Sequence, residues 1–288
     1  MVPNISVFDV FRRGKAVLYG RYGKALAFIC ILILCPTVFA GEMELTGSLT
    51  QGGLVLGHAD PGAKIVFKGR NIRVSPDGLF LLGFARDEPP TAHFIITFPD
   101  GHQKTQTLSI ARREYDIQRI DGLPSNKVSP SKQDLARIRK ESALVGGARV
   151  HDDARTDFRQ GFIMPVEGPI SGVYGSQRIL NGQPRRPHYG IDIAAPAGTP
   201  VRAPAGGIVT LAYPDMFFSG GTLIVDHGHG LSSSFLHLKQ ILVKVGQTVR
   251  QGDIIARVGA TGRVTGAHLD WRVNLFTTRL DPGLLVSR

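Results

Sequence analysis

The sequence predicts an all-β protein: an N-terminal immunoglobulin-like β-sandwich followed by a second domain of antiparallel strands. Two observations support this class. Short runs of alternating or β-branched residues recur along the chain with glycine and proline turns between them, and residues 161–288 lack long helical periodicity. No repeat at a solenoid period is present. The predicted segments are residues 1–40, 41–118, 119–160 and 161–288.

Residues 1–40 have the composition of a secretory signal peptide that is removed from the mature protein. Five basic residues precede an apolar run over residues 25–35, and cleavage is expected after Ala40. The run is short for a membrane span, although an uncleaved anchor stays open as an alternative. Leu34 before Cys35 is larger than a lipoprotein signal tolerates. We therefore expect export, most simply to the periplasm, with only transient contact with the membrane.

Charge and cysteine content narrow the partners and the chemistry. Cys30 and Cys35 both lie in the predicted signal, so the mature chain is expected to have no disulfide and no thiol chemistry. Without the signal the chain keeps 29 basic and 22 acidic residues, which lowers the net charge from +11 to +7. This excess favours an anionic cell-wall polymer or membrane surface as partner, and solubility explains it equally well. Export and the lack of a basic-aromatic motif argue against nucleic acid.

Residues 41–118 alternate strand-like runs with turn signals, which predicts the sandwich. The runs are residues 53–57, 63–67, 79–82, 93–98 and 104–110, and the turns are Asp60-Pro-Gly62, Pro76-Asp-Gly78 and Pro99-Asp-Gly101. The histidines here, His58, His93 and His102, lie next to turns, and we expect them at the surface. A binding or spacer role is the default for this domain.

Residues 119–160 are predicted to connect the two domains through one short helix. Residues 123–130 are polar and rich in helix breakers. The helix is expected over residues 131–144, because Ser131 can cap it, Asp134 follows three positions later, and Leu135 and Ile138 share a face. We expect this helix to be a linker or a latch packed on the following domain.

The motif His188-Tyr-Gly-Ile-Asp192 and the later His268-Leu-Asp270 carry the strongest chemical signal. Residues two apart on a strand point to one face, so His268, Asp270 and Arg272 are predicted to line a groove while the intervening apolar residues face the core. Asp192 lies between two isoleucines, where a carboxylate is costly unless it is paired or bound to a cation. Its alternative role is to cap a turn amide. Imidazole and carboxylate are the ligands that a catalytic zinc ion accepts.

Three further histidines and a glycine-rich loop give weaker signals. His237 lies in an apolar run, where a lone histidine is more often a core residue with one hydrogen bond. His227 and His229 have the spacing of a second metal pair, but the stretch is typical of a hairpin turn, and we favour a structural role. Residues 259–266 are only a weak phosphate-binding signal, because no helix follows them.

Together these residues resemble the lysostaphin-type (LytM-like) zinc metallopeptidases of bacterial cell-wall turnover. The resemblance covers about residues 161–275. It rests on blocks in the family order, at residues 170–175, 188–209, 225–230, 235–238, 245–252 and 259–269. It implies a barrel-like, antiparallel peptidase domain of lysostaphin type, with a groove between β-sheets that receives an extended peptide.

By position, the resemblance implies that His188, Asp192 and Asp270 bind one zinc ion and that His237 and His268 are catalytic. The family has a histidine where this chain has Asp270. Carboxylate oxygen binds zinc at a distance similar to imidazole nitrogen, so the site can persist. Two carboxylates weaken the polarising power of the ion, which predicts a slower enzyme or one that accepts a harder metal such as manganese.

The resemblance thus implies a zinc-dependent endopeptidase that hydrolyses the peptide cross-links of peptidoglycan. Two alternatives remain. Some relatives have lost their ligands, so the first is a catalytically degenerate domain that binds the wall and activates a peptidoglycan amidase. The second is a biotinyl- or lipoyl-like carrier module, which residues 207–209 and 243–255 resemble. That module lacks support, because its modifiable lysine and signature neighbours are absent.

Overall fold

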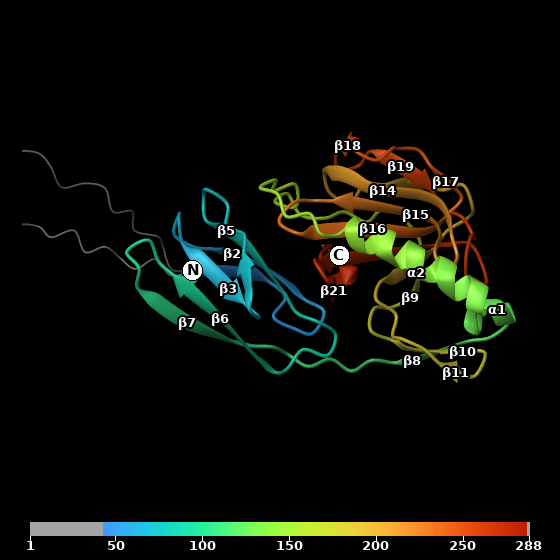
Figure 1. Cartoon of the computed structure of the whole chain (residues 1–288), viewed down its shortest axis with the longest axis horizontal. Coiled ribbons are helices and arrows are strands. Elements are labelled where there is room, and N and C mark those ends of the chain that lie inside the picture. Colours follow the sequence, from blue (N-terminus) through green and yellow to red (C-terminus); the bar gives the residue numbers. More distant parts are fainter. Residues whose placement is uncertain (1–42, 287–288) are drawn as a thin grey trace, which may run out of the picture. The chain divides into compact units, whose positions relative to one another are not determined.

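The computed structural model describes residues 43–286 of the 288-residue chain. The predicted secretory signal over residues 1–40 lies outside the described residues. The described chain is mostly β, as the sequence predicts, with two α-helices near its middle (Figure 1). Within residues 43–286, no helix combines the length and apolar character that a membrane crossing requires.

The N-terminal part consists of two antiparallel sheets that enclose one apolar core (Figure 1). The first has the order β1-β2-β5, which are Glu44–Gly47, Leu54–His58 and Leu79–Gly83. The second has the order β4-β3-β6-β7, which are Arg70–Ile72, Lys64–Phe67, Thr91–Thr97 and Gln103–Ser109. The last glycine of each predicted turn has a positive φ, which other residues rarely adopt. The immunoglobulin-like class of this part stays a prediction.

β5 is buried on both of its faces. Phe80 and Leu82 enter the core between the two N-terminal sheets. Leu79 and Leu81 instead enter the larger core of the C-terminal part. A strand covered on both sides requires an unbroken apolar run rather than alternation. This double burial explains the continuous apolar run at residues 79–82.

The connecting segment contains more structure than the sequence predicts. β8 (Ile117–Ile120) pairs in parallel with β10 (Gln177–Leu180), and a short helix, α1 (Ser125–Val128), follows it. Neither β8 nor α1 was expected. The longer helix, α2 (Lys132–Gly147), matches the predicted helix, and it begins with a capping box between Ser131 and Asp134.

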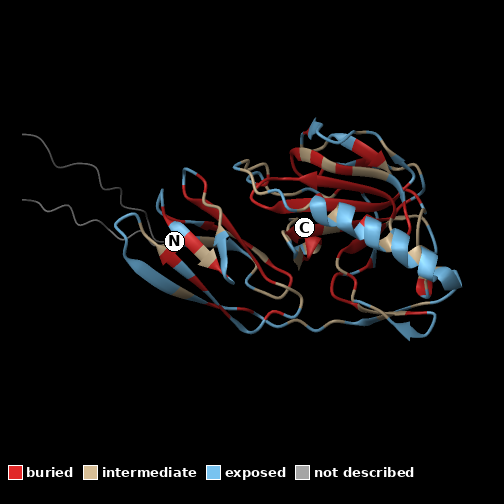
Figure 2. Cartoon of the chain, in the orientation of Figure 1, coloured by how far each residue is buried: buried red, intermediate tan, exposed pale blue. Residues whose placement is uncertain are grey.

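α2 packs against the C-terminal sheet, as expected for a latch. Val145 and Ala148 join a small apolar cluster with residues of that sheet. The buried carboxylate of Glu141 accepts a hydrogen bond from the backbone N–H of Phe217 at 2.8 Å. The predicted apolar face is wrong at Leu135, which is 39 % exposed. Figure 2 shows the side of the helix in view as exposed or half-buried.

The C-terminal part is built on one eight-stranded antiparallel sheet, which confirms the predicted arrangement. Its order is β18-β14-β15-β16-β20-β12-β9, with β21 paired to β20; the bounds are Thr248–Val249, Gly207–Met216, Gly220–Asp226, Leu231–Leu238, His268–Leu275, Ile191–Ala194, Ile170–Gly172 and Thr278–Leu280. Smaller elements complete the part: β13 (Pro200–Arg202), β19 (Ile254–Arg257), β17 (Gln240–Ile241), β11 (Gln183–Pro184) and the 3₁₀ turn η1 (Pro282–Leu284).

β20 positions the functional residues through its alternation. Leu269, Trp271 and Val273 are all 0 % exposed and lie in the large core, which confirms the predicted apolar face. The residues between them point to the opposite face. The large core therefore fixes the direction in which Asp270 and Arg272 point.

Candidate metal centre

Two neighbouring strands place two aspartates side by side. In the antiparallel pair of β12 and β20, Asp192 lies directly opposite Asp270. Both residues are buried, with exposures of 6 % and 0 %. Like charges directly opposite each other destabilise a sheet, and buried carboxylates are costly unless cations or hydrogen bonds compensate them. The pair therefore requires positive charge close to both carboxylates.

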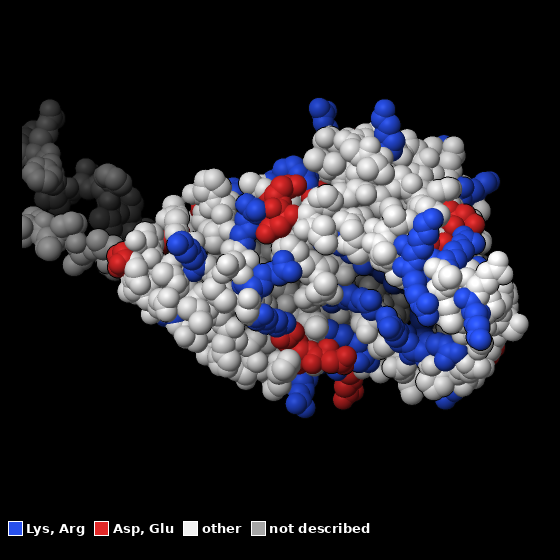
Figure 3. Space-filling view, in the orientation of Figure 1, with Lys and Arg blue, Asp and Glu red and all other residues white. Residues whose placement is uncertain are grey.

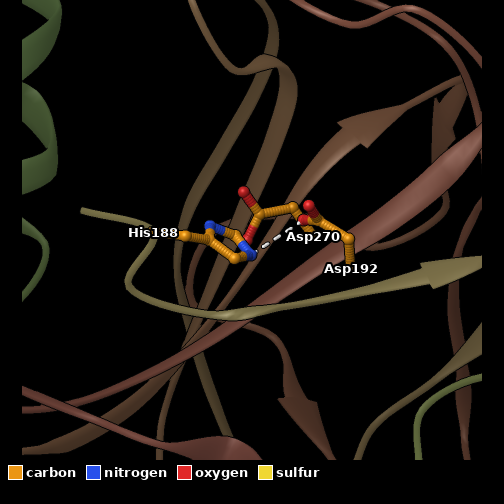
Figure 4. A group of neighbouring side chains, drawn as sticks. All are labelled: His188, Asp192 and Asp270. Atoms are coloured by element: carbon orange, nitrogen blue, oxygen red, sulfur yellow. Dashed lines mark ion pairs between the residues drawn. The ribbon is translucent and has the colours of Figure 1, made fainter. Parts of the chain in front are cut away.

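His188, in the loop before β12, adds an imidazole to the two carboxylates. Its side chain is buried, and Nε2 lies 3.1 Å from Oδ1 of Asp192. One ligating atom from each of His188, Asp192 and Asp270 lies within 4.8 Å of the others. Figure 4 shows the three side chains converging. Within residues 43–286 this is the one group of three such side chains that meets at this distance.

The three residues fit a metal ion. Both ring nitrogens of His188 and Oδ1 of Asp192 are buried without a hydrogen-bond partner, although buried polar atoms are nearly always satisfied. A shared cation would satisfy Nε2 and Oδ1 together. Gly190 leaves room beside them, because a Cβ there would lie 2.7 Å from Oδ1 of Asp270. One imidazole and two carboxylates form a ligand set that zinc accepts.

Two arginines hold the carboxylates from the other side. Nη2 of Arg178 lies 2.7 Å from Oδ2 of Asp192, and Arg272 donates to both oxygens of Asp270 at 2.9 and 2.5 Å. Burial would raise the pKa of Asp270, but the charge and hydrogen bonds of Arg272 outweigh it and lower that pKa. Burial and Asp270 likewise oppose ionisation of Asp192, yet His188 and Arg178 lower its pKa. Both side chains are thus ionised, the form that binds metal.

The sequence revealed only part of this arrangement. Alternation placed Arg272 on the polar face of its strand but did not reveal that it pairs with Asp270. Arg178 was missed entirely. It lies on β10, outside the eight-stranded sheet, and its contact with Asp192 depends on tertiary packing.

His237 and His268 direct equivalent nitrogens at the centre. Nδ1 of His237 lies 2.8 Å from the carbonyl oxygen of Thr261, and Nδ1 of His268 lies 2.9 Å from that of Gly266. A carbonyl can only accept, so each Nδ1 carries a proton and each Nε2 keeps its lone pair. Nε2 of His237 is 3.9 Å from Oδ2 of Asp270, and Nε2 of His268 is 3.8 Å from Oδ1 of Asp192. The ring centroids are 4.9 Å apart.

The backbone of His237 is strained. Its φ is +64°, in the left-handed region that few non-glycine residues occupy. The N–H of His237 donates to the carbonyl of Ser219 at 2.8 Å. A Cβ at Gly259 would lie 2.6 Å from the carbonyl oxygen of His237. The glycine-rich loop thus packs closely against the His237 backbone. Such strain gathers at functional sites.

The remaining histidines lie away from the metal centre. In His227, Nδ1 lies 2.6 Å from the carbonyl of Gly206 and Nε2 lies 2.8 Å from Oγ of Ser233, so both nitrogens are satisfied. His229 packs edge-on against Phe158, with ring centroids 5.3 Å apart. These contacts support the structural role that the sequence favours for the pair. The three N-terminal histidines are exposed, as predicted.

Comparisons with known proteins decide the family. A Pseudomonas aeruginosa crystal structure assigned to peptidase M23 is 30% identical to this chain, with a TM-score of 0.65. The superposition covers 82% of this chain and 94% of that one. The chain belongs to peptidase family M23. The model of Peptidase family M23 matches residues 186–282, a range that contains all five predicted site residues. The predicted lysostaphin-type resemblance is thereby confirmed.

Curated relatives match less than half of this chain. The peptidoglycan DD-endopeptidase ShyB of Vibrio cholerae is 44% identical over 124 residues, which are 42% of this chain and 26% of ShyB. The DD-carboxypeptidase/endopeptidase Mpg of Neisseria meningitidis is 38% identical over 97 residues, which are 34% of this chain and 22% of Mpg. The M23 chain thus spans about a quarter of the length of these relatives.

Proposed function

We propose that this M23 chain is a zinc-dependent endopeptidase that hydrolyses the peptide cross-links of peptidoglycan. One observation carries the proposal: His188, Asp192 and Asp270 converge in a geometry that fits a metal ion, and the Nε2 atoms of two further histidines lie 3.9 and 3.8 Å from the two carboxylates. The relatives named as peptidoglycan DD-endopeptidases support the substrate class. The proposal includes export to the periplasm and a division into residues 41–118, 119–160 and 161–288.

The two histidines divide the proton transfers of amide hydrolysis. When bound, zinc lowers the pKa of a water molecule and polarises the scissile carbonyl. Nε2 of His237 and Nε2 of His268 can each accept a hydrogen bond from one water molecule, which orients it for attack. Burial lowers the pKa of His237 to about 4, so this ring is a weak proton acceptor and serves mainly to orient.

His268 is the better proton acceptor in this proposal. Its side chain is 18% exposed, against 7% for His237, so it reaches the groove in which a peptide would lie. The hydrogen bond from Nδ1 to the carbonyl of Gly266 fixes the ring and leaves Nε2 free to accept a proton. After accepting the proton from water, Nε2 can donate it to the departing amine nitrogen.

Digestion of purified sacculi tests the proposal. The protein without residues 1–40 should release muropeptides cut at the cross-link, identified by mass. Chelator should stop the release, and added zinc should restore it. His188→Ala, which removes one ligand, should be inactive with or without zinc, and elemental analysis should find zinc in the wild type only.

The second candidate function is a degenerate domain that binds the wall and activates an amidase. Arg178 and Arg272 compensate the carboxylates without any metal, which is the arrangement such an activator would need. A protein that purifies without metal, leaves sacculi intact with zinc or manganese added, and still binds them would support the activator and contradict the peptidase.

A further inference from the structure

A cavity of about 460 Å³ lies between the C-terminal end of α2 and the main sheet. Four arginines from four separate segments line it: Arg70 of β4, Arg149 after α2, Arg186 before the metal motif, and Arg279 of β21. We call this cavity the arginine pocket. On the face shown in Figure 3, basic side chains gather around a hollow below α2.

The arginine pocket lacks compensating negative charge. Its one lining carboxylate, Glu141, is already held by Arg137 at 2.6 Å and by a backbone N–H. Among residues 43–286, none of the four lining arginines forms an ion pair with a carboxylate. Arg70 and Arg279 instead lie over aromatic rings, at 3.9 and 4.1 Å from the centroids. Four cations around one cavity attract an anion.

Arg149 is the most exceptional of the four. Its Nη2 donates to Oγ of Ser234 at 2.7 Å, while its Nε is buried without a partner. Burial, together with the charges of Arg272 and Arg279, lowers its pKa to about 10. A guanidinium offers five donors in a planar fork that matches a carboxylate. Arg149 therefore has donors left for a ligand.

The arginine pocket and the metal centre share one strand. Arg149 donates a hydrogen bond to Ser234, and Ser234 lies directly opposite Arg272 in the pairing of β16 with β20. Arg272 in turn holds Asp270, and Asn274, two positions further on the same face, lines the pocket. Four residues of strand separate Asp270 from Asn274, which is about 13 Å. An extended peptide cut at the metal centre can reach the pocket with a group a few residues away.

We propose that the arginine pocket binds a free carboxylate of the peptide substrate and so selects wall peptides whose carboxylates are not amidated. The proposal rests on the proposed function and deepens it. It assigns Arg149 as the principal recognition residue, and Arg186, which is exposed and has no hydrogen bond recorded within the described residues, as an outer one. Both act in binding and neither in the chemical step.

Calorimetric titration of the protein without residues 1–40 tests this directly. The probes are two synthetic cross-linked wall peptides, one with free carboxylates and one with carboxamides, both with a reduced scissile bond so that neither is cut. The free carboxylate should improve Kd by about 10- to 100-fold, the range expected for hydrogen bonds to a charged group. Arg149→Gln should remove most of this preference. Arg186→Gln, at an exposed side chain that cannot disturb folding, should remove a smaller part.

Arg139→Gln is the matched control, because Arg139 is an exposed arginine of α2 that does not line the pocket. It should keep the full preference. Equal affinity of the wild type for both peptides would overturn the inference, as would equal loss in the control. Inorganic phosphate is the competing probe: it should remove the preference for the carboxylate peptide and leave the affinity for the carboxamide peptide unchanged. An equal loss of affinity for both peptides would overturn the inference. The same preparation should also be tested for sacculus digestion. Digestion without a preference for the carboxylate peptide would overturn this inference alone, whereas a lack of digestion would overturn the proposed function.

Discussion

Two buried polar clusters lie on the same sheet, and they differ in how completely their hydrogen bonds are formed. Around His227, both ring nitrogens have partners and the neighbouring Asp226 pairs with Arg155. At the metal centre, both nitrogens of His188 and one oxygen of Asp192 have none. Histidine and aspartate occur in both clusters, so residue type does not distinguish them. Hydrogen-bond completion does, because an unsatisfied buried group is costly unless a ligand compensates it.

His229 shows that an unpartnered ring is not sufficient. Both of its nitrogens are buried without a partner, yet no group of three ligating side chains within residues 43–286 includes it. A metal centre needs unsatisfied atoms that also converge. This comparison leads to four predictions, in order of decreasing effect.

The largest effect is expected from Asp192→Asn. The amide keeps the shape of the side chain but removes the charge that a metal ion needs, so transition-state stabilisation of several kcal/mol should be lost. We expect peptide hydrolysis to fall by about 1,000-fold and bound zinc to disappear from elemental analysis. His227→Gln should keep its zinc and most of its rate. Equal loss in both variants would contradict the distinction between the clusters.

Arg272→Gln should destabilise the protein at the metal centre, and zinc should reduce that loss of stability. Removing one partner of a buried ion pair leaves Asp270 uncompensated, which should cost about 3 kcal/mol in the metal-free protein. Zinc compensates the same charge, so the loss should be smaller when zinc is bound. By linkage, the variant should then bind zinc more tightly than the wild type. Urea unfolding with chelator and with zinc measures both; an equal loss in the two conditions would contradict a metal site at Asp270.

How much of this the sequence could predict depends on distance along the chain. Alternation within β20 placed Asp270 and Arg272 correctly, and the capping box at Ser131 located α2, because both signals are local. The register that sets Asp192 opposite Asp270 joins strands far apart in sequence, and it follows only once the core is packed. Arg178 and the arginine pocket depend on such packing too. For α2, periodicity favoured Leu135, but a buried Glu141 makes the contact.

The pH dependence of stability should reveal the histidines that are buried without charge. Burial lowers the pKa of His227 to about 4, against 6.5 when unfolded. Below pH 6.5 the imidazole of His227 becomes protonated in the unfolded chain but stays neutral in the folded chain, so stability falls as the pH falls. At pH 5 the loss should be on the order of 2 kcal/mol. In the presence of chelator, buried His237 contributes a similar pH-dependent loss of stability. His227→Gln should reduce the dependence of the unfolding free energy on pH between pH 6.5 and 5, measured by urea unfolding. An unchanged slope would mean that His227 is not held neutral by burial.

The smallest effect is expected from Ser233→Ala, which turns the satisfied cluster into an unsatisfied one. Oγ of Ser233 contacts Nε2 of His227 at 2.8 Å, and its loss should cost about 1 kcal/mol in urea unfolding. Ser232→Ala is the matched control, because Oγ of Ser232 is equally buried on the same strand but has no partner to lose. Zinc should rescue neither variant, since the cluster around His227 lacks converging ligands. Stabilisation of Ser233→Ala by zinc would show that an unsatisfied histidine suffices to make a metal site here, and that convergence is not required.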